Sequence, residues 1–508
     1  MPISKELAEF EPIILKNKQI FEDLLSKIKA EPLAQKKIKL AKKAIQFALT
    51  ASTGYYSSEI LEQVFLDIAV QNDAENMPQD FVPGTFLHIM TEAYQSGGHT
   101  RVVERWIESS GETKRHSLLF TAKEKQVLPS RLEAAVAEKN GQIFKLKDAD
   151  NELANALELR KIASLFEFVI LHVHMHDVIP LLAFGSLQFQ RPVIFYNHAD
   201  HRFWLGASIA DIVADLRVKG QRLTQEFRGV KDSFLLGIPT DMPATKSQFD
   251  KTLAREKLSL PKDKKIVLTI GSAYKYSPIG SFDFLRVAEA LLQDEDVIVI
   301  GVGPDFKTLP KWQGLSKKMQ GRLVAKGIVP YEDVAAYIVA ADVVLDSFPM
   351  GGGTMMIDAV SHNCPVLFID SIFGQFDYLL GSNAQCKDID DLVAKTRLLL
   401  ADEMLQKQNV AEMKKRLDEK CGVDVWKKGL KKLYLQTPKT HKIRNFESKW
   451  DMRDDDVVLM FLYQKVKEKN LLVLGKLLKI FIKKDIYGKS LNIVLGKKNI
   501  LKLDLSKG

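Results

Sequence analysis

The sequence has little cysteine and no long apolar run. Its 508 residues contain three cysteines, at positions 364, 386 and 421, and their spacing matches no metal-binding motif. So few cysteines exclude a disulfide framework and favour a reducing environment. No stretch approaches the roughly 20 apolar residues of a membrane-spanning helix. The first residues, MPISKELAEFEP, have acidic side chains and no apolar core, so a secretory signal peptide is not expected. These absences predict a cytoplasmic protein.

A strong excess of one charge is also missing. The formal net charge is +9, with 27% charged and 46% apolar residues, which is ordinary for a globular protein. A diffuse positive excess of this size is compatible with an anionic ligand or with an anionic membrane surface. It does not distinguish between the two. The length predicts about two to four domains.

The first 80 residues predict a small helical domain for docking or for recognising an acceptor. Apolar and small residues recur between Leu40 and Leu49 at the spacing of one helix face, and lysines fill the positions between them. Aromatic side chains, which would stack on bases, do not alternate with these lysines, so a solvated helix face is favoured and no nucleic-acid partner is expected. Residues 72–83 are polar and predict a linker.

Two series of strands alternating with helices follow. The first series predicts strands at residues 85–90, 116–121, 142–146, 168–173, 193–196 and 230–238. The second predicts strands at residues 265–270, 296–302, 322–327, 343–345 and 365–369, with Ser281 as the cap of a helix and residues 241–264 as the interdomain linker. This alternation predicts an α/β fold with two Rossmann-like, doubly wound domains, in which ligands bind at the carboxyl ends of the strands.

Gly351, Gly352 and Gly353 lie between a predicted strand and a helix that begins at Thr354. A glycine-rich turn of this kind leaves backbone N–H groups free for a phosphate, although three glycines alone are equally compatible with a simple tight turn. Lys275 also falls just beyond a strand end, and Asp358 lies about one turn into the helix, where a carboxylate can face a ribose. The agreement among these positions favours a nucleotide site.

The segments YKYSP (residues 274–278) and ADVVLDSFPMGGGTMMIDAV (residues 341–360) resemble the nucleotide-binding half of GT-B glycosyltransferases. The resemblance is closest to O-GlcNAc transferases and related bacterial cytoplasmic protein glycosyltransferases. It implies that Lys275 meets the nucleotide diphosphate, that Gly353 and Thr354 meet the phosphates and that Asp358 holds the ribose. The family often has His-Thr-Thr at the phosphate turn, where this chain has Gly-Thr-Met. The similarity covers roughly residues 84–435 and is stronger in the second half.

The resemblance extends to the loop after the first strand. GT-B enzymes often have a glycine pair there, which matches Gly97 and Gly98, and O-GlcNAc-transferase-like enzymes place an active-site histidine there, which matches His99. The alternative is that His99 is structural. The resemblance also implies helices at residues 401–438 that cross back to the first domain, and catalysis without a bound metal.

Six of the ten histidines lie near predicted strand ends, at positions 99, 172, 174, 176, 198 and 201. Neutral imidazoles suit sugar hydroxyls and general-base catalysis near neutral pH. We therefore expect an acceptor side formed by His174, His198, Asp200 and His201. Metal binding by the histidines of residues 174–176 and 198–201 is the alternative, and no metal is predicted.

The expected organisation is a helical domain at residues 1–80, an acceptor domain at 84–240, a nucleotide-sugar domain at 260–400, crossing helices at 401–438 and an extension at 440–508. Residues 457–482 of the extension predict a basic amphipathic helix that contacts an anionic membrane, at the inner face, or packs on the main body. Residues 490–505 predict a hairpin.

The leading hypothesis is a glycosyltransferase of the hexosyltransferase type that uses a nucleotide sugar, a UDP-sugar above others, and no bound cofactor. Lys275 and the N–H groups of residues 352–354 would stabilise the leaving diphosphate, and His99 would act as base towards a protein, saccharide or lipid-linked acceptor. Residues 370–381 contain no glutamate for the Glu-x7-Glu pattern of retaining enzymes, which favours inversion. The alternatives are a sugar-nucleotide epimerase, a phosphorylase and a non-catalytic nucleotide-sugar-binding protein.

Overall fold

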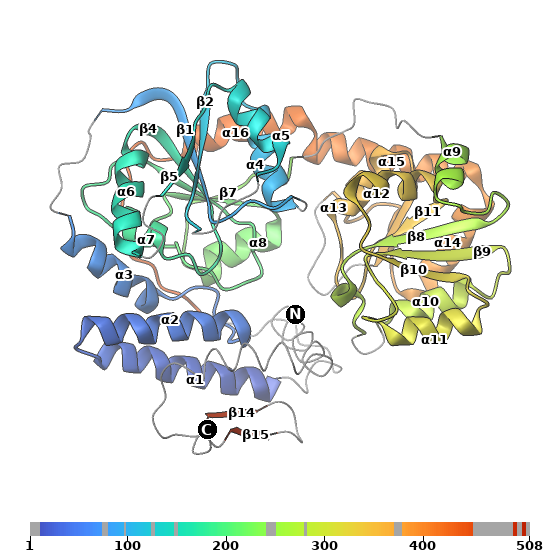
Figure 1. Ribbon diagram of the computed structural model, residues 1–508, viewed down its shortest axis with the longest axis horizontal. Coiled ribbons are helices and arrows are strands. Elements are labelled where there is room, and N and C mark those ends of the chain that lie inside the picture. Colours follow the sequence, from blue (N-terminus) through green and yellow to red (C-terminus); the bar gives the residue numbers. More distant parts are fainter. Residues whose placement is uncertain are drawn as a thin grey trace.

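The computed structural model describes residues 11–73, 80–95, 98–122, 128–146, 151–239, 250–278, 282–369 and 378–450, together with the backbone of residues 491–494 and 500–503. Two sheets, each flanked by helices, lie side by side, and helices α1 and α2 run along the underside of the first (Figure 1). We call the two sheets with their flanking helices the first and the second lobe. What the sequence predicts for residues outside these ranges stays a prediction.

The first lobe contains a parallel sheet of seven strands in the order β3-β2-β1-β4-β5-β6-β7. The strands are β1 (Val82–Met90), β2 (Arg115–Phe120), β3 (Ile143–Lys145), β4 (Phe166–His172), β5 (Val193–Tyr196), β6 (Ile212–Asp215) and β7 (Ser233–Leu235). Its helices are α4 (Gly98–Glu108), α5 (Ser130–Glu138), α6 (Glu152–Ser164), α7 (Ile179–Phe184) and α8 (Val218–Arg222), the last continued by a π-helical turn at Leu223–Phe227. The strand order reverses between β1 and β4, which creates a topological switch point.

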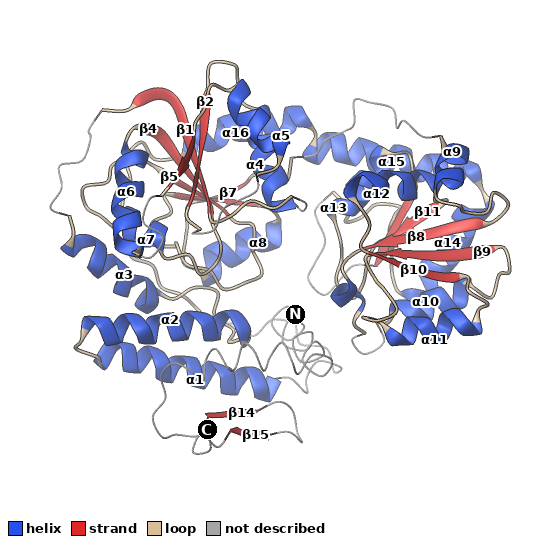
Figure 2. Ribbon diagram, in the orientation of Figure 1, coloured by secondary structure: helices blue, strands red, loops and turns tan. Residues whose placement is uncertain are grey.

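The second lobe contains a parallel sheet of six strands in the order β10-β9-β8-β11-β12-β13. The strands are β8 (Lys265–Ile270), β9 (Val297–Val302), β10 (Leu323–Gly327), β11 (Val343–Leu345), β12 (Val366–Ile369) and β13 (Gln385–Cys386). Its helices are α9 (Lys251–Lys257), α10 (Phe284–Leu291), α11 (Pro310–Lys318), α12 (Tyr331–Ala340), α13 (Thr354–Ser361) and α14 (Ile389–Ala401). Helices cover both faces of each sheet (Figure 2), so the predicted α/β fold with two doubly wound sheets is confirmed.

The N-terminal helices share a hydrophobic core with the first lobe. Helices α1 (Glu11–Ala30), α2 (Ala34–Thr50) and α3 (Glu59–Gln71) bury residues such as Phe21 in one cluster with Leu171 of β4. Full burial of one such aromatic side chain stabilises the fold by about 1.5–3 kcal/mol. The buried carboxylate of Glu62 accepts hydrogen bonds from the backbone N–H groups of residues 206, 207 and 208, at 2.7, 3.0 and 2.8 Å. The helices therefore form a layer on the first lobe, without a core of their own.

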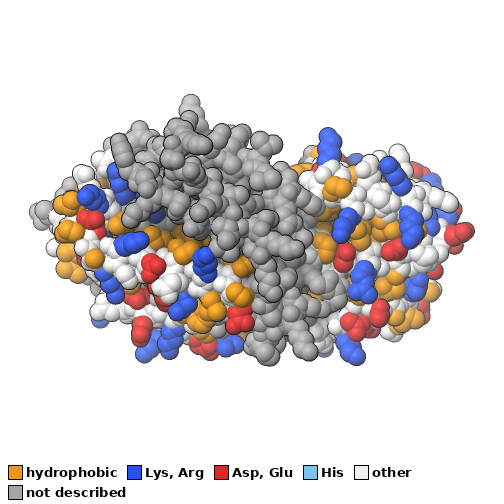
Figure 3. Space-filling view, turned by 90° about the horizontal axis from the view of Figure 1, so that it is seen from below, with side chains coloured by type: hydrophobic (Ala, Val, Ile, Leu, Met, Phe, Trp, Pro, Cys, Tyr) orange, Lys and Arg blue, Asp and Glu red, His pale blue; other side chains and the backbone are white. Residues whose placement is uncertain are grey.

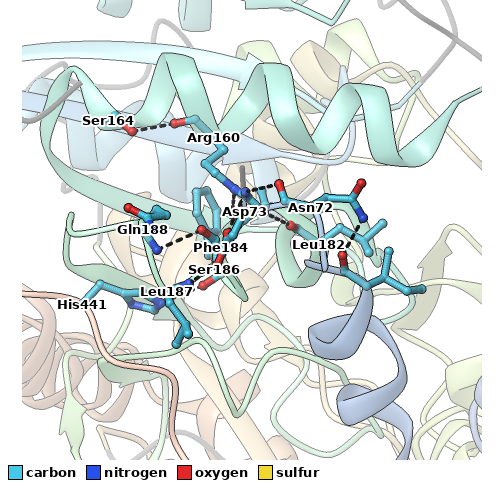
Figure 4. Close-up of polar contacts among 12 residues, drawn as sticks. Asn72, Asp73, Arg160, Ser164, Leu182, Phe184, Ser186, Leu187, Gln188 and His441 are labelled. Carbon is cyan, nitrogen blue, oxygen red and sulfur yellow. Dashed lines mark hydrogen bonds and ion pairs between the residues drawn. The ribbon is translucent and has the colours of Figure 1, made fainter. Parts of the chain in front are cut away.

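A buried arginine fixes the end of α3 on the first lobe (Figure 4). The Arg160 guanidinium donates to the carbonyl oxygens of Ala183 and Leu182 at 2.7 and 2.8 Å and to Asp73 at 3.1 Å. Asp73 in turn accepts from the backbone N–H of Leu187 at 2.9 Å. A buried charge needs such a complete set of partners, and these partners connect the helical layer to α6 and α7.

Two local predictions were wrong. The predicted linker at residues 241–264 contains α9, which packs against α12 and buries Arg255. The Arg255 guanidinium donates to Asp342 at 2.9 Å, so this segment belongs to the second lobe. Asp283, and not Ser281, caps α10, because its carboxylate accepts from the N–H of Leu285 at 3.0 Å. Ser281 itself lies outside the described residues.

Helices α15 (Glu403–Cys421) and α16 (Val423–Gln436) connect the two lobes (Figure 1). Met413 and Leu417 of α15 pack in the core of the second lobe, whereas Trp426 of α16 packs in that of the first. Gly422 separates the helices, and a Cβ atom there would lie 2.7 Å from the carbonyl oxygen of Asp418. The chain thus returns to the first lobe after completing the second.

Residues 441–450 of the C-terminal extension contact the first lobe and the helical layer. His441 Nδ1 is 2.7 Å from Asp211 Oδ2, and Trp450 Nε1 donates to the carbonyl oxygen of Thr53 at 2.9 Å. Strands β14 (Leu491–Val494) and β15 (Ile500–Leu503) pair antiparallel, as the predicted hairpin requires, and the residues between them lie outside the described ranges. The predicted basic helix at residues 457–482 lies outside the described residues.

On the described part of the face seen from below, basic and acidic side chains are interspersed with apolar ones (Figure 3). Within the described part of the chain, no helix is both long and apolar enough to cross a membrane.

Candidate functional site

Lys275 contacts the glycine-rich turn at the carboxyl edge of the second sheet. Strand β8 ends at Ile270, and a short 3-10 turn at Ala273–Tyr276 carries the lysine. Its Nζ donates to the carbonyl oxygen of Gly351 at 3.1 Å, and its own carbonyl oxygen accepts from the N–H of Met350 at 3.3 Å. Burial lowers the pKa of Lys275, and the nearby charge of Asp346 opposes this shift. Strands β8 and β11, which flank the switch point, thereby bring a cation onto the turn.

Asp346 organises the turn that follows β11. Its buried carboxylate accepts from the N–H groups of Ser347 and Gly352 at 2.9 and 2.6 Å. Burial raises the pKa of this carboxyl group, while these hydrogen bonds and Lys275 lower it. A Cβ atom at residue 352 would lie 2.8 Å from Asp346 Oδ1, so the close approach requires glycine. Gly353, with φ at 47°, precedes α13 in the left-handed region that glycine favours.

The predicted residues of the second lobe come together around this turn. Thr354 is exposed at the first position of α13 and donates to the carbonyl oxygen of Gly352 at 3.2 Å. Asp358 is half-buried on the same helix, one turn further on. Tyr378 holds the turn from the other side, since its hydroxyl donates to the carbonyl oxygen of Gly353 at 2.8 Å. The contact of Asp358 with a ribose stays a prediction.

His99 has one unprotonated ring nitrogen at the edge of the first sheet. Its Nε2 lies 3.0 Å from the carbonyl oxygen of His172. Because a carbonyl oxygen can only accept, Nε2 carries the proton and Nδ1 carries the lone pair. Nδ1 is buried and has no hydrogen-bond partner among the described residues. Burial, assisted by His174, lowers the pKa of His99 to about 4, so the ring is neutral at pH 7. Gly98 opens α4 beside it, and Gly97 lies outside the described ranges.

Two of the predicted acceptor-side histidines lie next to His99. The ring centroids of His99 and His198 are 4.2 Å apart, and those of His99 and His174 are 6.0 Å apart. His174 Nε2 is 2.9 Å from the hydroxyl of Tyr94, and burial lowers the pKa of this histidine. Three neutral or weakly basic imidazoles therefore gather at the carboxyl ends of β1, β4 and β5.

Asp200 and His201 form a separate cluster. The Arg217 guanidinium donates to both oxygens of Asp200 at 2.7 Å, and His201 Nδ1 lies 3.2 Å from Oδ1. Burial raises the pKa of Asp200, but the charge of Arg217 and the hydrogen bonds from His201 and Arg217 together outweigh this effect and hold the pKa well below the usual range. Asp200 is 2% exposed, and its pairing with Arg217 does not favour the predicted contact with an acceptor. His201 is half-buried at its side.

A positive charge of the first lobe acts on the turn after β8. Burial raises the pKa of Tyr274, the neighbour of Lys275. The positive charge of Arg202, which follows β5 in the first lobe, opposes this shift. The turn after β8 therefore lies within electrostatic reach of the loop after β5. Within the described ranges, no group of three or more His, Cys, Asp or Glu side chains is placed to hold a metal ion.

Comparisons with known proteins find no matching protein-family profile and no matching curated protein. Solved structures do match. HepE of Anabaena, in complex with UDP and glucose, is 12% identical with a TM-score of 0.53, over 69% of this chain and 99% of HepE. A glycosyltransferase of Rickettsia africae is 14% identical with a TM-score of 0.52, over 70% of this chain and 99% of its own. The fold is that of the GT-B glycosyltransferases. An O-GlcNAc transferase mutant of Thermobaculum terrenum is 14% identical with a TM-score of 0.48, over 79% of this chain and 80% of its own.

The switch points of both sheets carry polar groups that sequence reasoning missed. Asp346 and Tyr378 shape the glycine-rich turn, and His88 and His116 lie buried beneath the histidines of the first edge. An acidic residue directly after a buried strand was the available signal for Asp346. For His88, the signal was a histidine inside the apolar run TFLHIM. Tyr378 follows a stretch without a local pattern, so nothing in the sequence connects it with the turn.

Proposed function

We propose that the protein is a glycosyltransferase that moves a hexose from a UDP-sugar to a protein, saccharide or lipid-linked acceptor, without a bound metal or cofactor. The observation that carries this proposal is the contact of Lys275 with the turn at residues 351–354, at the switch point of a parallel sheet. A lysine and the N-terminus of a helix placed together suit a diphosphate. The likeness to HepE, whose structures contain UDP or UDP-glucose, supports a UDP-sugar as the donor.

The second lobe would stabilise the leaving group. As the bond between the anomeric carbon and the diphosphate breaks, its electron pair goes to the diphosphate oxygen, where negative charge develops. Lys275 and the backbone N–H groups at the start of α13 would interact with that charge more strongly than with the intact donor. Asp346 and Tyr378 fix the turn that leads into α13 in advance, so little reorganisation of these N–H groups is needed.

The first lobe would supply the base. His99 Nδ1 would take the proton of an acceptor hydroxyl or amide while the acceptor atom forms a bond to the anomeric carbon. A direct displacement of this kind inverts the configuration at that carbon. The neutral state of His99 at pH 7 and the lone pair on Nδ1 suit this role. His174 and His198 would border the acceptor. The proposed location is the cytoplasm, with the C-terminal extension in peripheral contact with the inner face of the membrane.

A thermal-shift panel tests the donor site. UDP-, GDP-, CMP- and TDP-sugars are added with and without EDTA to the wild type, to Lys275→Ala and to Lys407→Ala, which removes an exposed lysine of α15. A ligand at about 100 times its Kd stabilises the folded protein by about 2.7 kcal/mol. We expect stabilisation by UDP-sugars that persists in EDTA and in Lys407→Ala and is lost in Lys275→Ala. No stabilisation by any nucleotide sugar would contradict the proposal.

Product analysis separates the proposed transfer from its alternatives. Incubation of the wild type with the stabilising UDP-sugar and with peptide and saccharide acceptors should give a glycosylated acceptor and UDP. An epimerised nucleotide sugar would indicate an epimerase, and binding without turnover would indicate a sensor or docking protein.

A further inference from the structure

Four histidines form a continuous hydrogen-bonded chain across the first sheet. His116 Nδ1 lies 2.8 Å from His88 Nε2, and His88 Nδ1 lies 3.0 Å from His172 Nε2. His172 Nδ1 then lies 3.0 Å from His198 Nε2. The first three rings, on β2, β1 and β4, are fully buried, and the half-buried His198 follows β5 beside His99. The chain thus leads from the interior of the sheet to the candidate site.

The directions of the three hydrogen bonds are coupled. Burial lowers the pKa of all four rings, that of His88 to about 3, so each ring is neutral and has one N–H and one lone pair. A ring that donates on one side must accept on the other. The chain therefore has two arrangements: all N–H groups point towards His198, or all point towards His116.

The inner end of the chain distinguishes these arrangements. His116 Nε2 is buried and has no hydrogen-bond partner among the described residues. With the protons pointing inward, this atom would be a buried N–H without an acceptor, which proteins avoid more strictly than a buried acceptor without a donor. The charges of Lys114 and Lys139 also act on His116, and a lone pair suits their positive potential better than an N–H. Both considerations favour the outward arrangement.

We infer that the chain from His116 through His88 and His172 holds His198 with its proton on Nδ1, as a hydrogen-bond donor at the carboxyl edge of the first sheet. His99 has the opposite polarity there, because its Nε2–H donates to the carbonyl oxygen of His172. His172 therefore sets both rings, one through its side chain and the other through its backbone. The two neighbouring imidazoles therefore have different roles. His99 accepts a proton, and His198 donates a hydrogen bond to a substrate oxygen.

This assignment makes His88, His116 and His172 positioning residues, which act through His198 and do not touch the substrate. The roles of His99 and His198 towards a substrate rest on the proposed function, whereas the polarity of the histidine chain does not. His116 Nε2, at the buried inner end, has no described group with which to exchange a proton. We therefore expect the direction of the three hydrogen bonds to reverse only slowly.

Nuclear magnetic resonance of ring-15N-labelled histidine in the deuterated full-length protein tests the polarity without any substrate. Two-bond 1H–15N correlations distinguish Nδ1–H from Nε2–H rings, and single His→Gln variants assign the signals. We expect Nδ1–H for residues 88, 116, 172 and 198 and Nε2–H for His99. Nε2–H rings in the chain, or an imidazolium signal at pH 7, would overturn the inference, and this outcome is independent of whether the protein transfers a sugar.

Kinetics of His198 variants test the role of the donor. His198→Phe removes the donor, whereas His198→Asn keeps an N–H. We expect kcat to fall about 100-fold in the first and less in the second, with an unchanged KM for the UDP-sugar. His116→Phe, which leaves the site intact, should lower kcat about threefold to tenfold. Equal losses in His198→Phe and His198→Asn, in variants that unfold at the wild-type temperature, would contradict the donor role. Absence of transfer by the wild type would instead contradict the proposed function.

Discussion

The two sheets present different chemistry at corresponding edges. At the second edge, the polar groups are Lys275 and the N-terminus of α13, next to a turn whose Gly352 N–H donates to the buried Asp346. At the first edge they are imidazoles, which burial keeps neutral. Main-chain dipoles and a permanent cation suit a ligand that is always negative, whereas neutral imidazoles suit groups that gain or lose a proton. The comparison assigns the charged leaving group to the second lobe and proton transfer to the first.

Removing the base should abolish proton transfer at the first edge, leave the second edge unchanged and have the largest effect on turnover. In His99→Gln an amide can still donate to the carbonyl oxygen of His172 but cannot take a proton. We expect kcat to fall about 10²- to 10⁴-fold while UDP binding is kept. His176→Gln, which changes an exposed histidine of the first lobe, is the control. Wild-type turnover in His99→Gln would exclude this histidine as the base.

Removing the cation should weaken the interaction of the second edge with the diphosphate. Lys275→Ala deletes the group that meets the developing charge, so we expect a loss of about 10²- to 10³-fold in kcat/KM together with weaker UDP binding. The comparison with Lys407→Ala separates this loss from a general change in net charge. A loss restricted to kcat, with full UDP affinity, would show that Lys275 does not hold the nucleotide in the ground state.

Gly352→Ala tests whether the backbone of the glycine-rich turn contributes to UDP binding at the second edge. The added Cβ would lie 2.8 Å from Asp346 Oδ1 and would displace the N–H that Asp346 accepts. We expect a loss of about 1–3 kcal/mol in the free energy of unfolding and weaker UDP binding. Gly314→Ala is the control, since a Cβ there meets no atom within 4 Å. Equal effects of the two substitutions on UDP binding would argue against a preformed turn.

The buried imidazoles predict acid sensitivity. Burial lowers the pKa of His88 to about 3, whereas the unfolded chain takes up a proton near pH 6.5. Its contribution to stability is therefore complete above pH 6.5 and is lost as the pH falls towards 3. We expect the free energy of unfolding to drop by about 1.5–2 kcal/mol between pH 6.5 and 5 from this residue alone. Urea unfolding of wild type and His88→Leu should show a shallower pH dependence in the variant, and equal slopes would contradict the buried neutral ring.

Patterns along the chain were enough to predict the fold and the contact of Lys275 with the glycine-rich turn. Apolar runs predicted most strands, and the position of Lys275 and the glycines just beyond strand ends predicted that they would meet. Strand β6 was missed because Ile212–Asp215 directly follows the apolar segment 203–210 and has no turn signal of its own. Helix α9 was missed because its seven residues carry no clear apolar period. Its place depends on the pairing of Arg255 with Asp342, 87 residues away.

The histidine chain lay beyond sequence reasoning for a similar reason. His88 meets His116 and His172 across separations of 28 and 84 residues, and no periodic pattern connects them. Pairing of this kind depends on the register of β1 with β2 and β4, which only the assembled sheet determines. The low pKa values follow from that burial and not from residue type.

The most direct test of the division between the edges is the affinity for UDP, measured by titration calorimetry on wild type, Lys275→Ala and His99→Gln. The account predicts that Lys275→Ala weakens UDP binding by about tenfold or more, since hydrogen bonds to charged groups contribute about 1.5–3 kcal/mol, while His99→Gln binds like the wild type. Wild-type affinity in Lys275→Ala, or an equal loss in His99→Gln, would contradict the assignment of the nucleotide to the second lobe.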